Sequence, residues 1–279
     1  MQPKQCIAII DSIKAYAKQN PTEAQVYEDW FQAVVNLRDA LPQDKRFDAY
    51  KYSGELRSVC AAMMDKMKTG EDVAKVYDII SRTYLFEAKD VFDSYCIYLE
   101  WNRAPEKKFY QPRRKVLRTV ANALQDLADD RLDLLAISMP PGCGKTALAI
   151  FYLTWLAGRN PDEPMLTGSH SNSFVRGVYD ECLRIFDKDG EYLWNDVFPD
   201  VTVSNTNAKD CRIDLGKRKR FETLEFTSIG TGNAGLYRAS TLLYCDDLVS
   251  GIEVALSKPR LDKLWETYTT DLRQRKIGN

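Results

Sequence analysis

The segment DLLAISMPPGCGKTALAIFYL, from Asp133 to Leu153, constrains the fold of this chain more than any other. A short apolar run typical of a buried strand leads into two prolines, a loop with two glycines, and a segment with helical apolar spacing. Backbone N–H groups of such a loop and the positive end of the helix point into one concavity, which favours phosphate binding. The segment therefore predicts a strand over 132–138, a nucleotide-phosphate loop and a helix over 146–158.

The loop residues have distinct expected roles. The glycines allow close backbone approach to the phosphates, the lysine contacts the β- and γ-phosphates of ATP, and the threonine hydroxyl binds Mg²⁺. The predicted nucleotide-binding residues are Gly142, Cys143, Gly144, Lys145 and Thr146. The usual pattern G-x-x-x-x-G-K-[ST] has Met139 here in place of its first glycine. An ordinary strand-to-helix turn is the alternative interpretation.

A pair of acids ends a second apolar segment, TLLYCDD, at Asp246 and Asp247. Two adjacent carboxylates at the end of a buried strand are costly unless a cation or hydrogen-bond donors meet them, which favours Asp246 as a metal ligand. A solvated strand end is the alternative. Asp247 and Glu253 are both candidates for the base that orients the attacking water. Ser250 and Glu253 also have the spacing of a capping box, in which Glu253 would only satisfy a helix start.

The first hundred residues differ from the rest, because only two of the chain's 14 glycines lie there. Apolar residues recur at three- and four-residue spacing, which predicts four or five helices. We expect an all-helical N-terminal region over 1–104. The remainder, 105–279, is expected to form a P-loop ATPase domain that is incomplete at its C-terminal end.

Strand and helix patterns alternate after an amphipathic helix at 115–130. Strands are expected at 164–169, 211–216, 222–228 and 240–245, with a helix at 173–186. Alternation of this kind predicts an α/β fold, a sheet with helices on both faces.

Composition excludes several classes of protein. The seven cysteines include no C-x-x-C pair and there is one histidine, so a disulfide framework or a structural zinc site is not expected. Neither a membrane span nor a signal peptide fits the sequence, which favours a cytoplasmic location and no membrane partner. The net charge of −1 does not indicate a polyanion partner, so any nucleic-acid contact depends on local basic patches.

Three segments together, MPPGCGKTALAIFYLTW, CDDLVSGIEVALSKPRLDKLW and FYQPRRKVL, resemble the ATPase part of a bacteriophage terminase large subunit. That family's loop often lacks the leading glycine. The resemblance implies a RecA-like P-loop NTPase fold with Walker A and Walker B motifs, Mg²⁺ and ATP as cofactors, and translocation of double-stranded DNA during viral DNA packaging. It further implies a small terminase subunit, a portal protein and a homo-oligomeric ring as partners, action at the procapsid portal in the host cytoplasm, and an endonuclease domain in the full-length protein.

One departure from that family concerns an arginine. Many members place an arginine in the loop where this chain has Gly142, and an arginine on the transferring phosphate accelerates the reaction by about 10³ to 10⁵. Our candidate replacement is Arg238, acting on the ATP of a neighbouring subunit, with Arg184 in reserve. A solvated loop arginine is the alternative.

Basic residues gather between Arg103 and Arg118, seven of them against one acid. The resemblance implies that Tyr110, Gln111 or Arg113 frames the adenine, whereas contact with DNA phosphates and a solvated helix start are the alternatives. The run at 217–220 most simply forms a charged hairpin turn. Competing functions for the whole chain are a helicase-like motor, a small-molecule kinase and a nucleotide-binding module with little turnover.

Overall fold

The computed structural model describes residues 1–230 and 237–277 and contains two compact units, Met1–Asp90 and Val91–Asn279. The sequence placed the boundary at 104/105. Residues 91–104 belong instead with the second unit, because the helix α5 (Phe92–Leu99) packs on α6 (Tyr110–Ala128) and α7 (Lys145–Arg159). The first part of the loop that precedes Arg238 lies outside the described residues.

The first unit is helical, as the sequence predicted. Its α-helices are α1 (Pro3–Gln19), α2 (Ala24–Ala40), α3 (Tyr50–Met63) and α4 (Gly70–Ala88), with 3₁₀ turns η1 (Gln43–Ala49) and η2 (Met64–Lys66). The apolar stripe of α2 is buried, because residues spaced three and four apart share one face of a helix. Thr69 caps α4 by accepting a hydrogen bond from the N–H of Asp72.

The second unit is an α/β structure with a five-stranded sheet in the order β2-β3-β4-β1-β5. The strands are β1 (Met165–Ser169), β2 (Val203–Asn207), β3 (Arg212–Leu215), β4 (Leu224–Ser228) and β5 (Leu242–Cys245). Strand β1 is parallel to both of its neighbours, β4 and β5, whereas β2, β3 and β4 pair antiparallel, so the sheet is mixed. Four of these strands were predicted; β2 was not, because its polar sequence VSNTN carries little apolar alternation.

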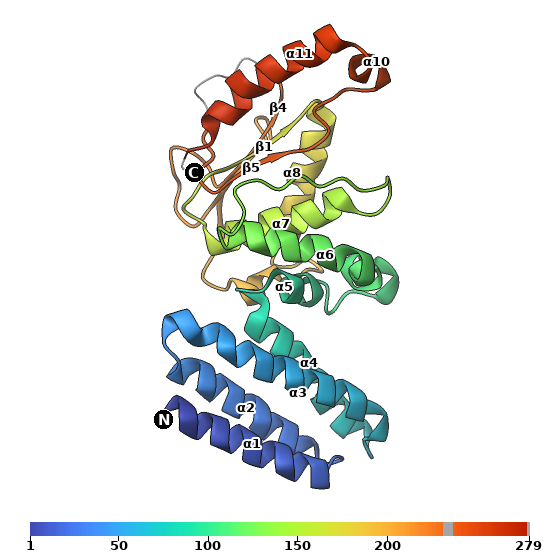
Figure 1. Cartoon of the computed structure of the whole chain (residues 1–279), viewed down its shortest axis with the longest axis vertical. Coiled ribbons are helices and arrows are strands. Elements are labelled where there is room, and N and C mark those ends of the chain that lie inside the picture. The colour runs from blue at the N-terminus through green and yellow to red at the C-terminus, as the bar shows by residue number, and fades with distance from the viewer. Residues whose placement is uncertain (231–236, 278–279) are drawn as a thin grey trace. The chain divides into compact units, whose positions relative to one another are not determined.

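Helices surround this sheet in Figure 1, with α8 against β1 and β4 and α7 against α8. The remaining elements are η3 (Pro105–Lys107), α8 (Asn172–Phe186), α9 (Trp194–Val197), α10 (Ile252–Ala255), α11 (Lys258–Thr267), the π-helical turn η4 (Tyr268–Leu272) and η5 (Arg273–Arg275). On the face of the sheet opposite α8, Leu272 clusters with Leu166 of β1, and Tyr268 packs against this cluster. Both faces of the central strands are therefore covered, as a parallel pair requires.

The strand predicted over 132–138 is not formed. The segment is extended, pairs with no described strand, and leaves the side chain of Leu134 81% exposed. Strand β5 is one edge of the sheet. A hydrophobic run gains its stability as a central strand only when neighbours pair with it and helices cover it, and this run has neither here.

Aromatic packing fixes the position of α7. The rings of Trp155 and Phe92 are tilted relative to each other with centroids 5.2 Å apart, and the Tyr95 and Thr154 hydroxyls lie 2.8 Å apart. The indole N–H of Trp194 donates to the carbonyl of Thr154 at 3.0 Å. Because these side chains are buried in one dense layer, the C-terminal half of α7 is held firmly against its neighbours.

A carboxyl group is buried inside the sheet at Glu225 of β4. It is fully buried, and neither of its oxygens forms a hydrogen bond with any described residue. Burial, and then the neighbouring Glu222, raises the pKa of Glu225 to about 8. Glu225 is therefore a protonated, neutral carboxyl at and below neutral pH.

Candidate functional site

The glycine loop, residues 139–144, turns the chain into α7 through two left-handed backbones. Gly142 has φ of 78° and Gly144, the N-cap of α7, has φ of 92°. Glycine adopts these angles without the Cβ collision that other residues suffer. The amide groups of the first turn of α7 have no intrahelical acceptors, so they remain available to an anion at this end of the helix.

The space next to Gly144 is filled by a neighbouring residue, so no side chain fits at this position. A Cβ on Gly144 would lie 2.3 Å from the ring of Phe109, which precedes α6. The loop and the start of α6 therefore pack directly on each other. The sequence pattern assigns no role to Phe109, whose only signal is an aromatic ring in the basic run before the predicted amphipathic helix.

The start of α6 decides which residues could frame a bound base. Arg113 lies near the loop, since its guanidinium stands 5.4 Å from the Phe109 ring centroid and donates to the Phe109 carbonyl at 3.2 Å. Gln111 is exposed in the first turn. The prediction that Tyr110 could frame the base was wrong. Tyr110 is fully buried, and its hydroxyl donates to Asp93 at 2.6 Å.

The two motifs meet at Asp246. This carboxylate, 4% exposed, follows β5 directly, and the ammonium of Lys145 lies 2.7 Å from its Oδ1. The hydroxyl of Thr146, one hundred residues away in the sequence, donates to Oδ2 at 3.2 Å. The hydrogen bond to Asp246 raises the pKa of Lys145 further above its usual value. The sequence predicted each of these residues, and the structure brings all three together.

Tyr244 is a partner of Asp246 that sequence reasoning missed. Its hydroxyl donates to Asp246 Oδ2 at 2.8 Å, and burial followed by the charge of Asp246 raises its pKa. Residues two apart on a strand share a face, so the spacing in YCDD carried this signal. Tyr244 leaves one fewer acceptor position of the carboxylate free and fixes its orientation.

Asp247 points its side chain outward beside the same lysine. Its carboxylate is 65% exposed and lies 3.9 Å from Lys145 Nζ. Its φ of 46° places it in the left-handed region, at a cost of roughly 1 to 2 kcal/mol for a residue with a Cβ. The carbonyl of Asp247 accepts a hydrogen bond from the N–H of His170 at 3.3 Å.

Glu253, the other candidate base, has its ionic contact with a residue outside the cluster of Lys145, Asp246 and Asp247. Its carboxylate is 87% exposed and its ion pair is with Arg260 at 3.6 Å. The predicted capping box is wrong, since Gly251 is the N-cap of α10 and no side chain caps the helix. Gly251, with φ of 121°, takes the cap position that Ser250 would have needed. Of the two candidates, Asp247 is the one in ionic contact with Lys145.

The two arginine candidates lie at the opposite end of the sheet from Asp246. Arg238 is exposed just before Ser240, whose N–H bonds to Pro164 at the start of β1. Arg184 is near the end of α8, which begins beside the carboxyl end of β1 and rises about 1.5 Å per residue. Neither arginine can therefore reach the Asp246 of its own chain.

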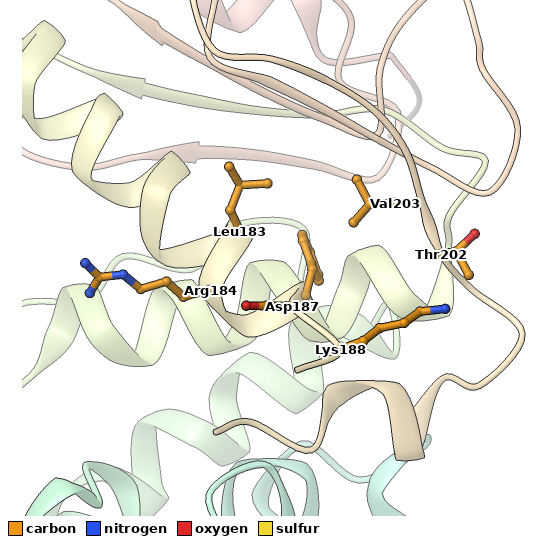
Figure 2. A pocket seen from close by; sticks show the side chains of 7 residues that line it. Leu183, Arg184, Asp187, Lys188, Thr202 and Val203 are labelled. Atoms are coloured by element: carbon orange, nitrogen blue, oxygen red, sulfur yellow. The ribbon is translucent and has the colours of Figure 1, made fainter. Parts of the chain in front are cut away.

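A shallow pocket surrounds the end of α8. Its lining residues are Leu183, Arg184, Phe186, Asp187, Lys188, Thr202 and Val203. Figure 2 shows Lys188 beside Thr202 on one side, with Arg184 extending away on the other. Arg184 pairs with Glu181 at 2.7 Å.

Most cations of the basic segment serve the fold. Arg103 and Lys107 pair with Glu191, and Arg114 pairs with Asp93 at 2.6 Å. Lys115 and Arg118 are exposed on α6. A DNA contact by this segment would therefore depend on few cations, which weakens that interpretation.

The charged hairpin turn at 217–220 is present between β3 and β4, and one of its lysines faces inward. Lys219 binds Asp214 at 2.9 Å and donates to the Pro161 carbonyl at 2.6 Å. The exposed cations of the turn are Lys217, Arg218 and Arg220.

The cysteines at the two motifs behave as small apolar residues. All seven cysteines are free. Burial raises the pKa of the Cys245 thiol to about 12, so it carries no thiolate near neutral pH.

The oxygen donors at Asp246 suit a hard divalent cation. Thr146 and Asp246 supply the hydroxyl and carboxylate oxygens that Mg²⁺ prefers, with the remaining positions left to water and phosphate. Next to them on β1, the buried hydroxyls of Thr167 and Ser169 have no hydrogen-bond partner among the described residues. Ordered water around a cation would satisfy such groups. No group of three or more acidic, histidine or cysteine ligands occurs in the described parts of the chain.

Comparison with models of protein families, with characterised proteins and with solved structures found no match. Within residues 1–230 and 237–277, no helix has the length and apolar character needed to cross a membrane.

Proposed function

We propose that this chain binds Mg²⁺ and ATP at the glycine loop and hydrolyses ATP. The observation that carries this proposal is the meeting of Lys145 and Thr146 with Asp246, at the end of a strand one hundred residues away. A loop of glycines, a lysine and a threonine at a helix start, and an acid at a neighbouring strand end are the parts needed to hold a nucleotide and its metal.

Each residue has a role that follows from its position. Lys145 leaves Asp246 to contact the β- and γ-phosphates, and the free amide groups at the start of α7 bind phosphate oxygens. Thr146 and Asp246 would hold Mg²⁺, which would supply positive charge next to the phosphates. Arg113, stacked on Phe109, and Gln111 lie where the base would rest.

Asp247 is our candidate for the group that directs the attacking water. Its carboxylate accepts the proton of that water as the water oxygen bonds to the γ-phosphorus and the bond from phosphorus to the ADP oxygen breaks. Asp247 has the required contact with Lys145 and an exposed carboxylate, whereas Glu253 pairs with Arg260.

The biological process we propose is DNA packaging by a terminase large subunit. This step rests on the resemblance of the loop, the acidic strand end and the basic segment to that family. Double-stranded DNA, a small terminase subunit, a portal protein and further copies of this chain are the partners it implies. The position of Arg238 and Arg184 away from their own site supports one element of this proposal, an active site completed by a neighbouring copy.

The first test is ATP hydrolysis by residues 1–279 in Mg²⁺, measured over a wide range of protein concentration with duplex DNA present. We expect the rate per chain to rise with concentration, because an arginine from a second copy completes the site. A constant, appreciable rate would favour a self-contained enzyme and contradict the motor. ATP binding without turnover would favour the nucleotide-binding module.

Arg238→Ala separates binding from turnover. We expect this variant to bind ATP with the affinity of the wild type and to lose about 10³-fold or more in hydrolysis rate, because the charge on the transferring phosphate is no longer neutralised. The matched control is Arg218→Ala, which removes an exposed arginine from the hairpin turn. Unchanged turnover in Arg238→Ala would exclude this arginine.

A further inference from the structure

The carbonyl of Asp247 is held by two donors from one residue. The N–H of His170 lies 3.3 Å from this oxygen, and His170 Nδ1 is also within hydrogen-bond distance of it. A carbonyl oxygen accepts hydrogen bonds and cannot donate, so the ring nitrogen facing it must carry the proton. In the neutral imidazole the other ring nitrogen, Nε2, is then the acceptor.

This contact occurs where the β1–β5 ladder ends. The N–H of Asp246 donates to Gly168 at 3.0 Å, in register with the parallel pair. In a regular parallel ladder the N–H of His170 would donate to the carbonyl of Asp246. It donates instead to the carbonyl of Asp247, one residue further along the chain. The chain absorbs that residue by the left-handed turn at Asp247.

The turn decides where the second acid points. It leaves the carboxylate of Asp247 3.9 Å from Lys145 while Asp246 remains bonded to the same lysine. Strand geometry alone would send neighbouring side chains to opposite faces of the sheet. His170 therefore holds the backbone conformation that brings both acids to one lysine.

We propose that His170 is a positioning residue that orients Asp247 toward the attacking water, an inference that rests on the proposed function. His170 acts through the Asp247 backbone and does not itself contact nucleotide. Its ring is exposed, so it contributes little to the buried core. Removing the ring should therefore affect the chemical step more than nucleotide binding or folding.

Three variants test the donor. His170→Asn places an amide nitrogen at the position of Nδ1, His170→Gln moves the donor one bond further out, and His170→Ala removes it. We expect His170→Ala and His170→Gln to lose about tenfold or more in kcat with an unchanged KM for ATP, and His170→Asn to stay within about threefold of the wild type. In an Asp247→Asn background, His170→Ala should cause no further loss, because the two residues act as one unit.

A second measurement does not depend on activity. Because His170 is the only histidine in the chain, its side chain gives the only imidazole signals in a long-range ¹H–¹⁵N NMR spectrum. We expect the Nδ1-protonated tautomer in the nucleotide-free protein. A predominant Nε2-protonated tautomer would overturn the inference.

The remaining outcomes are distinct. A positioning role would be contradicted if His170→Ala had the kcat of the wild type, or if His170→Asn and His170→Ala lost activity equally. It would also be contradicted if His170→Ala lost ATP binding or thermal stability. In each case ATP hydrolysis by the wild type would stand. A wild-type protein that neither binds nor hydrolyses ATP would overturn the proposed function, and this inference with it.

Discussion

Lys145→Ala is expected to reduce ATP hydrolysis by at least about 10³-fold and to weaken nucleotide binding, because it removes a side-chain cation that contacts both acids of the site. Asp246 keeps donors from Thr146 and Tyr244, so the fold should survive the loss. Hydrolysis of labelled ATP and equilibrium binding of a fluorescent ATP analogue measure the two effects.

Lys188→Ala is the matched control for this variant, since it removes an exposed lysine from the pocket at the end of α8. We expect it to retain wild-type hydrolysis. Melting temperatures of both variants should lie within a few degrees of the wild type. A Lys145→Ala protein that melts normally and still hydrolyses ATP at the wild-type rate would refute the role we give to the glycine loop.

Glu225→Gln is expected to change how stability depends on pH. The pKa of Glu225 rises from 4.5 in the unfolded chain to about 8 in the folded one, so between these values the native state binds more protons than the unfolded state. The contribution of Glu225 to the free energy of unfolding therefore falls as pH rises from about 5 to 8, by at most about 1.4 kcal/mol per pH unit. Glutamine stays neutral and removes this loss, so the variant should be more stable than the wild type at pH 8, by on the order of 3 kcal/mol, and similar to it at pH 5.

Urea unfolding of both proteins at pH 5, 6, 7 and 8, followed by tryptophan fluorescence, measures this difference. Glu266→Gln is the control, because Glu266 is an exposed glutamate of α11 and its replacement should leave the pH dependence unchanged. Parallel stability curves for the wild type and Glu225→Gln would show that the carboxyl of Glu225 titrates normally.

Sequence patterns identified most elements of the second unit because they report how apolar residues repeat. Helix α7 and strand β5 have clear periodicity and apolar content, and the residues that follow the loop and end the strand were therefore placed correctly. The apolar run at 132–138 has the same signal and forms no strand. Hydrophobicity indicates that a segment favours burial, but pairing depends on which neighbours the rest of the fold presents.

The errors at the site have local physical causes. Tyr110 and Phe109 are adjacent, and the exact start of α6 decides that Tyr110 faces the core and Phe109 the loop. Gly251 displaced Ser250 as the N-cap of α10. His170 had no periodic signal at all, because only the register between β1 and β5 places it beside Asp247.

The placement of Arg238 and Arg184 makes each copy polar. In the proposed arrangement, an arginine at the amino end of the strands of one copy completes the nucleotide site at the carboxyl end of the strands of the next copy. Such contacts require the copies to be stacked head to tail. A two-fold dimer joins identical surfaces, so it would bring two like ends together and leave both sites without an arginine. Head-to-tail contacts repeat until they close on themselves or continue as a filament. If a neighbouring copy supplies the arginine, as we propose, complete sites would require closed rings or open helices of this chain.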